Sequence, residues 1–351
     1  MDFEEFKERL TEDLKQDLYE RTGNEHYIDV TNVNKLQNVS YEALTIRPEN
    51  SPVGVNLDVQ SLFEAYEKSG DYDRVIDTAI DTVVKGFENQ PSFNIQDFTN
   101  YDVMKEKLSI QVVATERNTE MLANIPHKEI EDMSMVCRFI VDAGPAGQGS
   151  ILVNNAMLDT FGITKEQLFE DAVKYAPEIK PSEIRSMLDI MIETLGIAVN
   201  QRDLGGEVDT MYVATTTDKT NGAGIIAYPG FMDVAAEKVG GDFFLLPSSV
   251  HEVIIVPDNG EMNFRDLEAM VREVNANEVA PQDQLSDHVY HYDSKDKVFE
   301  LAEKFEARQA AKERTSEKES VLKDLSDKQK EIADKPKVKS DKAHKKGEAS
   351  L

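Results

Sequence analysis

The chain has 351 residues, enough for one large domain or two smaller ones, and 40% of them are hydrophobic, which suffices for a packed core. Its net charge of −28 argues against nonspecific binding of the folded body to nucleic acid or to an anionic membrane. The charge is uneven: residues 295–351 hold 16 of the 39 Lys and Arg and 13 of the 67 Asp and Glu. This segment therefore has a net charge of +3, and the residues before it have −31.

Targeting and redox signals are sparse. Cys137 is the one cysteine, so an intramolecular disulfide is excluded, and its position in the apolar run Met135–Val141 predicts a buried, inert thiol. The first ten residues, MDFEEFKERL, lack the basic and apolar regions of a signal peptide. No segment reaches the roughly 20 apolar residues that span a bilayer. We expect a cytoplasmic protein without a membrane segment.

Helix and strand patterns alternate irregularly through the first half. Apolar residues spaced by three or four predict a helix from about Asp2 to Arg21 that ends near Gly23. Strands are expected at 26–33, 44–47, 53–57, 110–115, 131–142 and 150–154. Helices are expected at 62–68, 74–87, 98–107, 164–175 and 182–195, and residues 118–125 are expected to form a short linking helix or a loop. Gly144–Gly149 lacks the Lys-Ser/Thr ending of a phosphate-binding loop, and we interpret it as a hairpin turn.

The stretch Glu207–Asp258 carries the clearest folding signals. Strand-like apolar runs occupy 211–214, 243–246 and 253–256, and a helical pattern at 231–239 lies between Pro229 and Gly240. The last two runs flank the turn sequence Pro-Ser-Ser-Val-His-Glu and predict a β-hairpin. A helix at 263–274 and a short strand within 286–293 follow. From Lys295 we expect a helix that begins near Val298, and disorder beyond about Glu331.

These elements predict an α+β fold with mostly antiparallel sheets built from hairpins, because no regular strand–helix–strand alternation occurs. We expect an N-terminal α+β subdomain at 1–130, a central α+β subdomain at 131–294 and a charged tail, helical to disordered, at 295–351.

Catalytic and metal-binding patterns are incomplete. His251-Glu252 lacks the second histidine of a zinc-protease helix, and His127, His288 and His291 have no ligand spacing, so we expect no metal and no cofactor. Ser249, His251 and Glu252 are weak candidates for nucleophile, base and orienting residue. No Gly-x-Ser-x-Gly elbow accompanies them, and Ser-Ser after Pro is ordinary turn chemistry.

The segments Gly222–Gly230 and Leu245–Pro257 resemble domain-of-unknown-function family 5688, found mainly in Firmicutes. The similarity extends from Phe3 to about Asp293 and includes Pro52–Leu57. The layout of 151–172 and 224–257 is more loosely similar to family 1444. Neither resemblance brings a catalytic residue, cofactor or activity. The resemblance implies a bacterial cytoplasmic protein, encoded on a mobile element in one interpretation.

The sequence therefore leaves three classes of function open. We favour a non-enzymatic interaction or accessory protein with an unidentified protein partner. The alternatives are a hydrolase-like enzyme that uses Ser249, His251 and Glu252, and an acidic DNA mimic that binds a DNA-binding protein. The sequence leaves the oligomeric state open.

Overall fold

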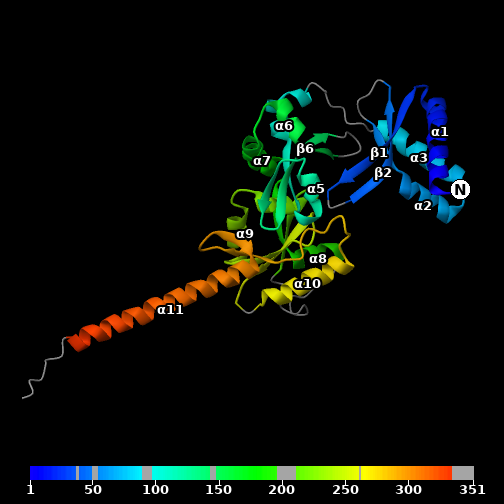
Figure 1. The fold of residues 1–351 in the computed structure, drawn as a ribbon. Coiled ribbons are helices and arrows are strands. Elements are labelled where there is room, and N and C mark those ends of the chain that lie inside the picture. The colour runs from blue at the N-terminus through cyan, green and yellow to red at the C-terminus, as the bar shows by residue number, and fades with distance from the viewer. Residues whose placement is uncertain are drawn as a thin grey trace, which may run out of the picture. The chain divides into compact units, whose positions relative to one another are not determined.

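The computed structural model describes residues 1–36, 39–49, 54–88, 97–142, 148–195, 211–260 and 262–333. The chain divides into two compact units, Met1–Ala302 and Glu303–Leu351. Helix α11 (Ala302–Ala333) supplies the described part of the second unit (Figure 1). The first unit contains three antiparallel sheets and carries the features discussed below.

The N-terminal sheet consists of β1 (His26–Lys35), β2 (Val39–Pro48) and β3 (Val55–Asp58), in that order. Helices α1 (Phe3–Thr22), α2 (Val59–Ser69) and α3 (Tyr72–Glu88) pack with it. Asp2 and Glu5 form a reciprocal capping box at the start of α1, and Gly23 ends the helix in the left-handed conformation. The apolar stripe of α1, at Phe6, Leu10, Leu14 and Leu18, is completely buried in this core.

The second sheet has β6 (Met133–Asp142) at its centre. β4 (Leu108–Ala114) pairs with one side of β6, and β5 (His127–Ile130) and β7 (Gln148–Leu152) pair with the other. Helix α7 (Lys165–Ile179) packs on β4 and contacts β6. Short helices accompany this sheet: η1 (Asp97–Thr99), α4 (Tyr101–Met104), η2 (Lys105–Lys107), η3 (Glu116–Asn118), α5 (Thr119–Leu122) and α6 (Asn155–Phe161).

The third sheet has six antiparallel strands in the order β13-β12-β10-β11-β9-β8. Their bounds are β8 (Ser182–Ser186), β9 (Tyr212–Thr216), β10 (Phe243–Leu246), β11 (Glu252–Pro257), β12 (Tyr290–Asp293) and β13 (Val298–Leu301). Helices α8 (Met187–Leu195), η6 (Gly222–Ala227), α9 (Phe231–Val239) and α10 (Phe264–Asn277) belong to the same part of the chain. One continuous apolar core joins residues of this sheet to residues of the β4–β7 sheet.

The structure confirms the α+β fold and its antiparallel sheets. The predicted β10–β11 hairpin and helix α9 are present, and Cys137 is buried, which raises the pKa of its thiol. Among the described residues, no helix is both long enough and apolar enough to cross a membrane. The three-part division of the chain stays a prediction. The turn at 143–147, and the tail beyond 333 expected to be disordered, lie outside the described residues.

Two predicted elements need correction. Residues 182–195 were expected to form one helix, but Ser182–Ser186 form β8 and the helix begins at Met187. Pairing with β9 overrides the local helical pattern there. Likewise, Val298 and Leu301 belong to β13, which pairs with β12, so that α11 begins only at Ala302. In both cases, contacts with a strand distant in sequence decide the outcome.

Candidate functional site

The structure places Ser249 in the loop before β11, where its side chain supports the turn. Ser249 is 5% exposed, and its Oγ accepts a hydrogen bond from the backbone N–H of His251 at 3.0 Å. Its backbone forms an isolated bridge with Gln284. These contacts give Ser249 the ordinary role of a serine in a tight turn.

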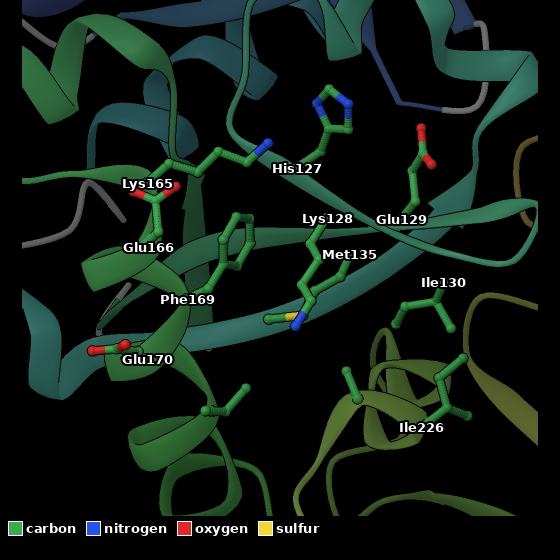
Figure 2. A pocket seen from close by; sticks show the side chains of 12 residues that line it. His127, Lys128, Glu129, Ile130, Met135, Lys165, Glu166, Phe169, Glu170 and Ile226 are labelled. Atoms are coloured by element: carbon green, nitrogen blue, oxygen red, sulfur yellow. The ribbon is translucent and has the colours of Figure 1, made fainter. Parts of the chain in front are cut away.

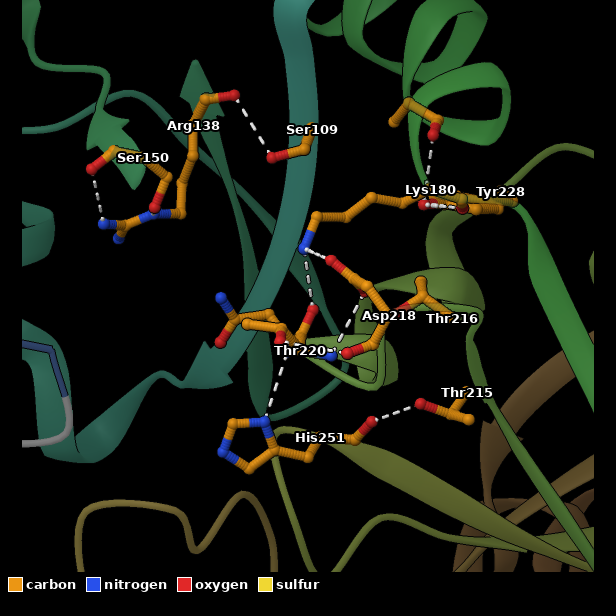
Figure 3. A network of polar contacts seen from close by, with 12 residues as sticks. Ser109, Arg138, Ser150, Lys180, Thr215, Thr216, Asp218, Thr220, Tyr228 and His251 are labelled. Carbon is orange, nitrogen blue, oxygen red and sulfur yellow. Dashed lines mark hydrogen bonds and ion pairs between the residues drawn. The ribbon is translucent and has the colours of Figure 1, made fainter. Parts of the chain in front are cut away.

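The His251 ring is held by two other elements. Its Nδ1 accepts the backbone N–H of Asn221 at 3.3 Å (Figure 3). Its Nε2 lies 3.4 Å from Oδ1 of Asp283. With Nδ1 as acceptor, the neutral ring carries its proton on Nε2 and directs it to the carboxylate. This tautomer leaves no ring nitrogen available to take a proton from Ser249.

Glu252 is the first residue of β11, and its side chain lies elsewhere. It pairs with Thr215 of β9 and lines a cavity of about 330 Å³ together with Arg185 and Lys219. Successive side chains of a strand point to opposite faces, so Glu252 diverges from its neighbour His251. The partner of the histidine is Asp283, and the structure does not bring Ser249, His251 and Glu252 into one constellation.

An ion pair between the buried Lys180 and the partly exposed Asp218, close to His251, was not anticipated from the sequence. Lys180 is 5% exposed, and its Nζ lies 2.7 Å from Oδ2 of Asp218 and donates to the carbonyl of Thr220 at 3.0 Å (Figure 3). Burial raises the pKa of Asp218, but hydrogen bonds from Lys180, Thr216 and the Thr220 N–H outweigh it and hold that pKa below its ordinary value. The pair ties the end of α7 to the loop that precedes η6.

The residues of this pair lie 38 positions apart, and no motif spacing connects them. Since the ammonium is neutralised by a carboxylate and a carbonyl, we assign the pair to structure: it fixes the loop at 217–221. Asn221 in that loop has a left-handed backbone with φ of 54°, which turns its N–H toward His251. Within the described parts of the chain, no group of three or more His, Cys, Asp or Glu could hold a metal ion.

A groove of about 760 Å³ lies beside β5 in the first unit. One wall is the strand itself, since His127, Lys128, Glu129 and Ile130 all line the groove (Figure 2). Lys128 and Glu129 are exposed, and the residues that end the strand are half-buried. We call this hollow the β5 groove.

The opposite wall of the β5 groove is one face of α7, and its floor is apolar. Lys165, Glu166, Phe169, Glu170 and Val173 recur at helical spacing along this wall (Figure 2). The floor consists of Met135 of β6 with Ile226 and Ala227 of η6. The β5 groove therefore combines an apolar floor with charged walls.

The charged side chains of the β5 groove are two lysines and three glutamates. Lys128 and Glu129 come from the strand, and Lys165, Glu166 and Glu170 come from the helix. The predictions from sequence did not include this site, because its residues lie in three separate segments without any recognisable motif. No strand was predicted at His127–Ile130, so β5 itself was missed.

Of three comparisons with known proteins, one gives a match. The Family of unknown function (DUF5688) matches residues 3–294, which is most of the chain and nearly all of its first unit. A search of curated proteins and a search of solved structures found no match. The chain therefore belongs to the Family of unknown function (DUF5688).

Proposed function

We propose that this chain is a non-enzymatic binding protein that docks another protein in the β5 groove. The observation that carries the proposal is the apolar floor of Met135, Ile226 and Ala227 between the charged walls of β5 and α7. Protein interfaces characteristically combine an apolar centre with a polar rim. The groove is also large enough to take several side chains of a partner.

The charge of the chain supports a basic partner. Residues before Lys295 have a net charge of −31, and such a field speeds the approach of a cationic protein and favours its binding at low salt. The same charge supports a narrower alternative, in which the acidic body occupies the DNA-binding surface of its partner. Competition by duplex DNA distinguishes this DNA mimicry from docking in the β5 groove alone.

A matched pair of variants tests the proposal. Val173→Glu places a charge on the half-buried wall of the β5 groove, whereas Val234→Glu makes the same change on α9 at a valine that is 58% exposed. The full chain and both variants are used to capture partners from a host lysate at low and high salt. We expect the wild type and Val234→Glu to retain one basic partner that Val173→Glu loses, with both variants folded by circular dichroism.

Capture that is unchanged in Val173→Glu would contradict docking in the β5 groove. The enzyme alternative has a test of its own: a serine-reactive probe that labels the wild type but not Ser249→Ala. The tautomer of His251 argues against that outcome, since its acceptor nitrogen is occupied by the N–H of Asn221. Labelling that depends on Ser249 would replace our proposal by the hydrolase.

A further inference from the structure

Strand β1 forms one edge of the N-terminal sheet, and the residue before it shows which of its backbone groups are paired. The carbonyl of Glu25 accepts the N–H of Glu49, which continues the register of the β1–β2 pair by one step. Backbone groups alternate in direction along an antiparallel strand, so the odd-numbered residues of β1 pair with β2. The N–H and C=O groups of Ile28, Val30 and Asn32 therefore point away from the sheet.

The outer edge of β1 is open with respect to the described residues. None of their hydrogen bonds uses the outward backbone groups of Ile28, Val30 or Asn32. Among the described elements, α1 and β2 make the main contacts with β1. Val30 is 54% exposed and Tyr27 is 52% exposed. The register with β2 runs through ten consecutive pairs without a bulge, so this edge is long and regular.

The edge of β1 lacks the features that usually protect an edge strand from pairing. Such features are short length, prolines, bulges and lysines or other charges along the strand. Between Ile28 and Val33 the one charged residue is Asp29, and its Oδ2 lies 3.8 Å from Nη2 of Arg47 in the same chain. The opposite edge strand, β3, is protected by its length of only four residues. A long, regular and weakly charged edge is a template for another strand.

We propose that β1 pairs with β1 of a second copy of this chain, antiparallel and with Val30 opposite Val30. The sequence of the strand selects this occupant, because in this register the strand is complementary to itself. Asp29 faces Thr31 of the second copy, so no like charges are opposed, and Tyr27 faces Val33, a favourable aromatic and β-branched pair. The exposed Val30 is covered by the same residue of the second copy.

The two neighbouring registers are less favourable. A pairing centred on Asp29 sets this carboxylate opposite itself in a non-hydrogen-bonded pair, where side chains lie closest and like charges destabilise. A pairing centred on Thr31 sets the exposed Val30 opposite Asn32, so that the valines do not meet. Pairing through Val30 gives a symmetric dimer with one continuous sheet, whose two outer strands are the four-residue β3 of each copy. The long edges are thereby removed.

Salt separates this self-association from the docking of a basic partner in the β5 groove. Each chain has a net charge of −28, so two copies repel each other at long range and added salt screens the repulsion. We expect the β1 dimer to become tighter as the salt concentration rises, whereas a complex with a basic partner becomes weaker. The dimer is independent of the proposed function, and the failure of either leaves the other standing.

A charge exchange at one position tests the dimer and its register. Val30→Lys and Val30→Glu each place like charges at the centre of the interface, and Val234→Glu makes the same change at an equally exposed valine of α9. Sedimentation of the full chain over a range of concentrations measures dimerisation. We expect the wild type and Val234→Glu to dimerise equally, and each Val30 variant about tenfold more weakly. An equimolar mixture of the two Val30 variants should dimerise again, because Lys then faces Glu.

Thermal unfolding verifies that the variants are folded, and each remaining outcome then decides the claim. A wild type that stays monomeric at every concentration and salt would overturn the dimer. A dimer that both Val30 variants leave unchanged would place the interface elsewhere. If each variant is monomeric and their mixture stays monomeric too, Val30 does not face Val30 and the register is wrong. A monomeric wild type that retains a lysate protein which Val30→Lys loses would identify another occupant of the β1 edge.

Discussion

The two outer edges of the β4–β7 sheet differ in whether another segment of the chain covers them. All seven residues of β4 are buried, and η6 lies against its outer edge. β5 has exposed Lys128 and Glu129 at its centre and borders an open groove. Both strands pair with the same β6, so position in the sheet does not explain the difference. What differs is whether another segment of the chain can approach the edge closely.

Glycine makes that approach possible at β4. A Cβ on Gly224 of η6 would lie 2.5 Å from the carbonyl oxygen of Ile110, closer than any real contact. Asp132, which precedes β6, accepts a hydrogen bond from Thr115 on the β4 side, and backbone groups alternate in direction along antiparallel strands, so the carbonyl of Ile110 points outward from β4. The edge is thus covered by backbone-to-backbone contact, which only glycine permits. At β5, charged side chains occupy the edge instead, which is how an uncovered strand stays soluble.

Breaking the covered edge should produce the largest effect. Gly224→Ala forces the new methyl group against the backbone of Ile110, and we expect a loss of about 3 kcal/mol in the free energy of unfolding. Glu129→Ala at the open edge should change that free energy by less than about 0.5 kcal/mol. Urea denaturation of both variants measures the contrast. Equal stabilities would show that η6 moves aside without cost and that the covered edge is not tightly packed.

The next contrast lies within β5 itself. By the same alternation, Met135 directs its backbone groups to its partner Lys128, and those of Glu129 point outward. Lys128→Pro removes an N–H that the register assigns to β6, and we expect it to cost about 2 kcal/mol. Glu129→Pro removes an outward N–H and should cost less than about 0.5 kcal/mol. Hydrogen exchange of β6 amides gives an independent measurement. A larger cost for Glu129→Pro than for Lys128→Pro would reverse the assignment of paired and open groups.

The sequence predicted what depends on local pattern and missed what depends on distant contacts. The hairpin of β10 and β11 was recoverable because apolar strands flank a turn-forming sequence. Residues 182–186 were predicted as helix because their local sequence contains no signal for the pairing with β9. The β5 groove and the Lys180–Asp218 pair could not be found in this way, since each brings together segments that share no motif.

A smaller loss of stability is expected from mutations that affect the loop that leads into η6. Lys180 holds Asp218 and the carbonyl of Thr220, and so fixes the loop that leads into η6. Lys180→Met keeps the length of the side chain but leaves both acceptors without the ammonium. Because the Asp218 side chain is 36% exposed and water can partly replace the lysine, we expect a loss of about 1 to 2 kcal/mol. Lys297→Met, at a pair whose side chains are 66% and 47% exposed, is the control and should leave the free energy of unfolding nearly unchanged.

The stability contributed by the Lys180–Asp218 ion pair depends on pH. The pKa of Asp218 is lower in the folded protein than its ordinary value of 3.8, so between these two pKa values the unfolded chain binds more protons. The contribution of Asp218 to stability is therefore fully present above about pH 4 and is lost as the pH falls through the folded-state pKa. Lys180→Met removes a hydrogen bond that lowers this pKa. We expect the unfolding free energy of the variant, measured from pH 2 to pH 6, to fall less steeply at the acid end than that of the wild type. Parallel curves would show that Asp218 keeps its low pKa through Thr216 and the Thr220 N–H alone, and that Lys180 anchors the loop without setting its titration.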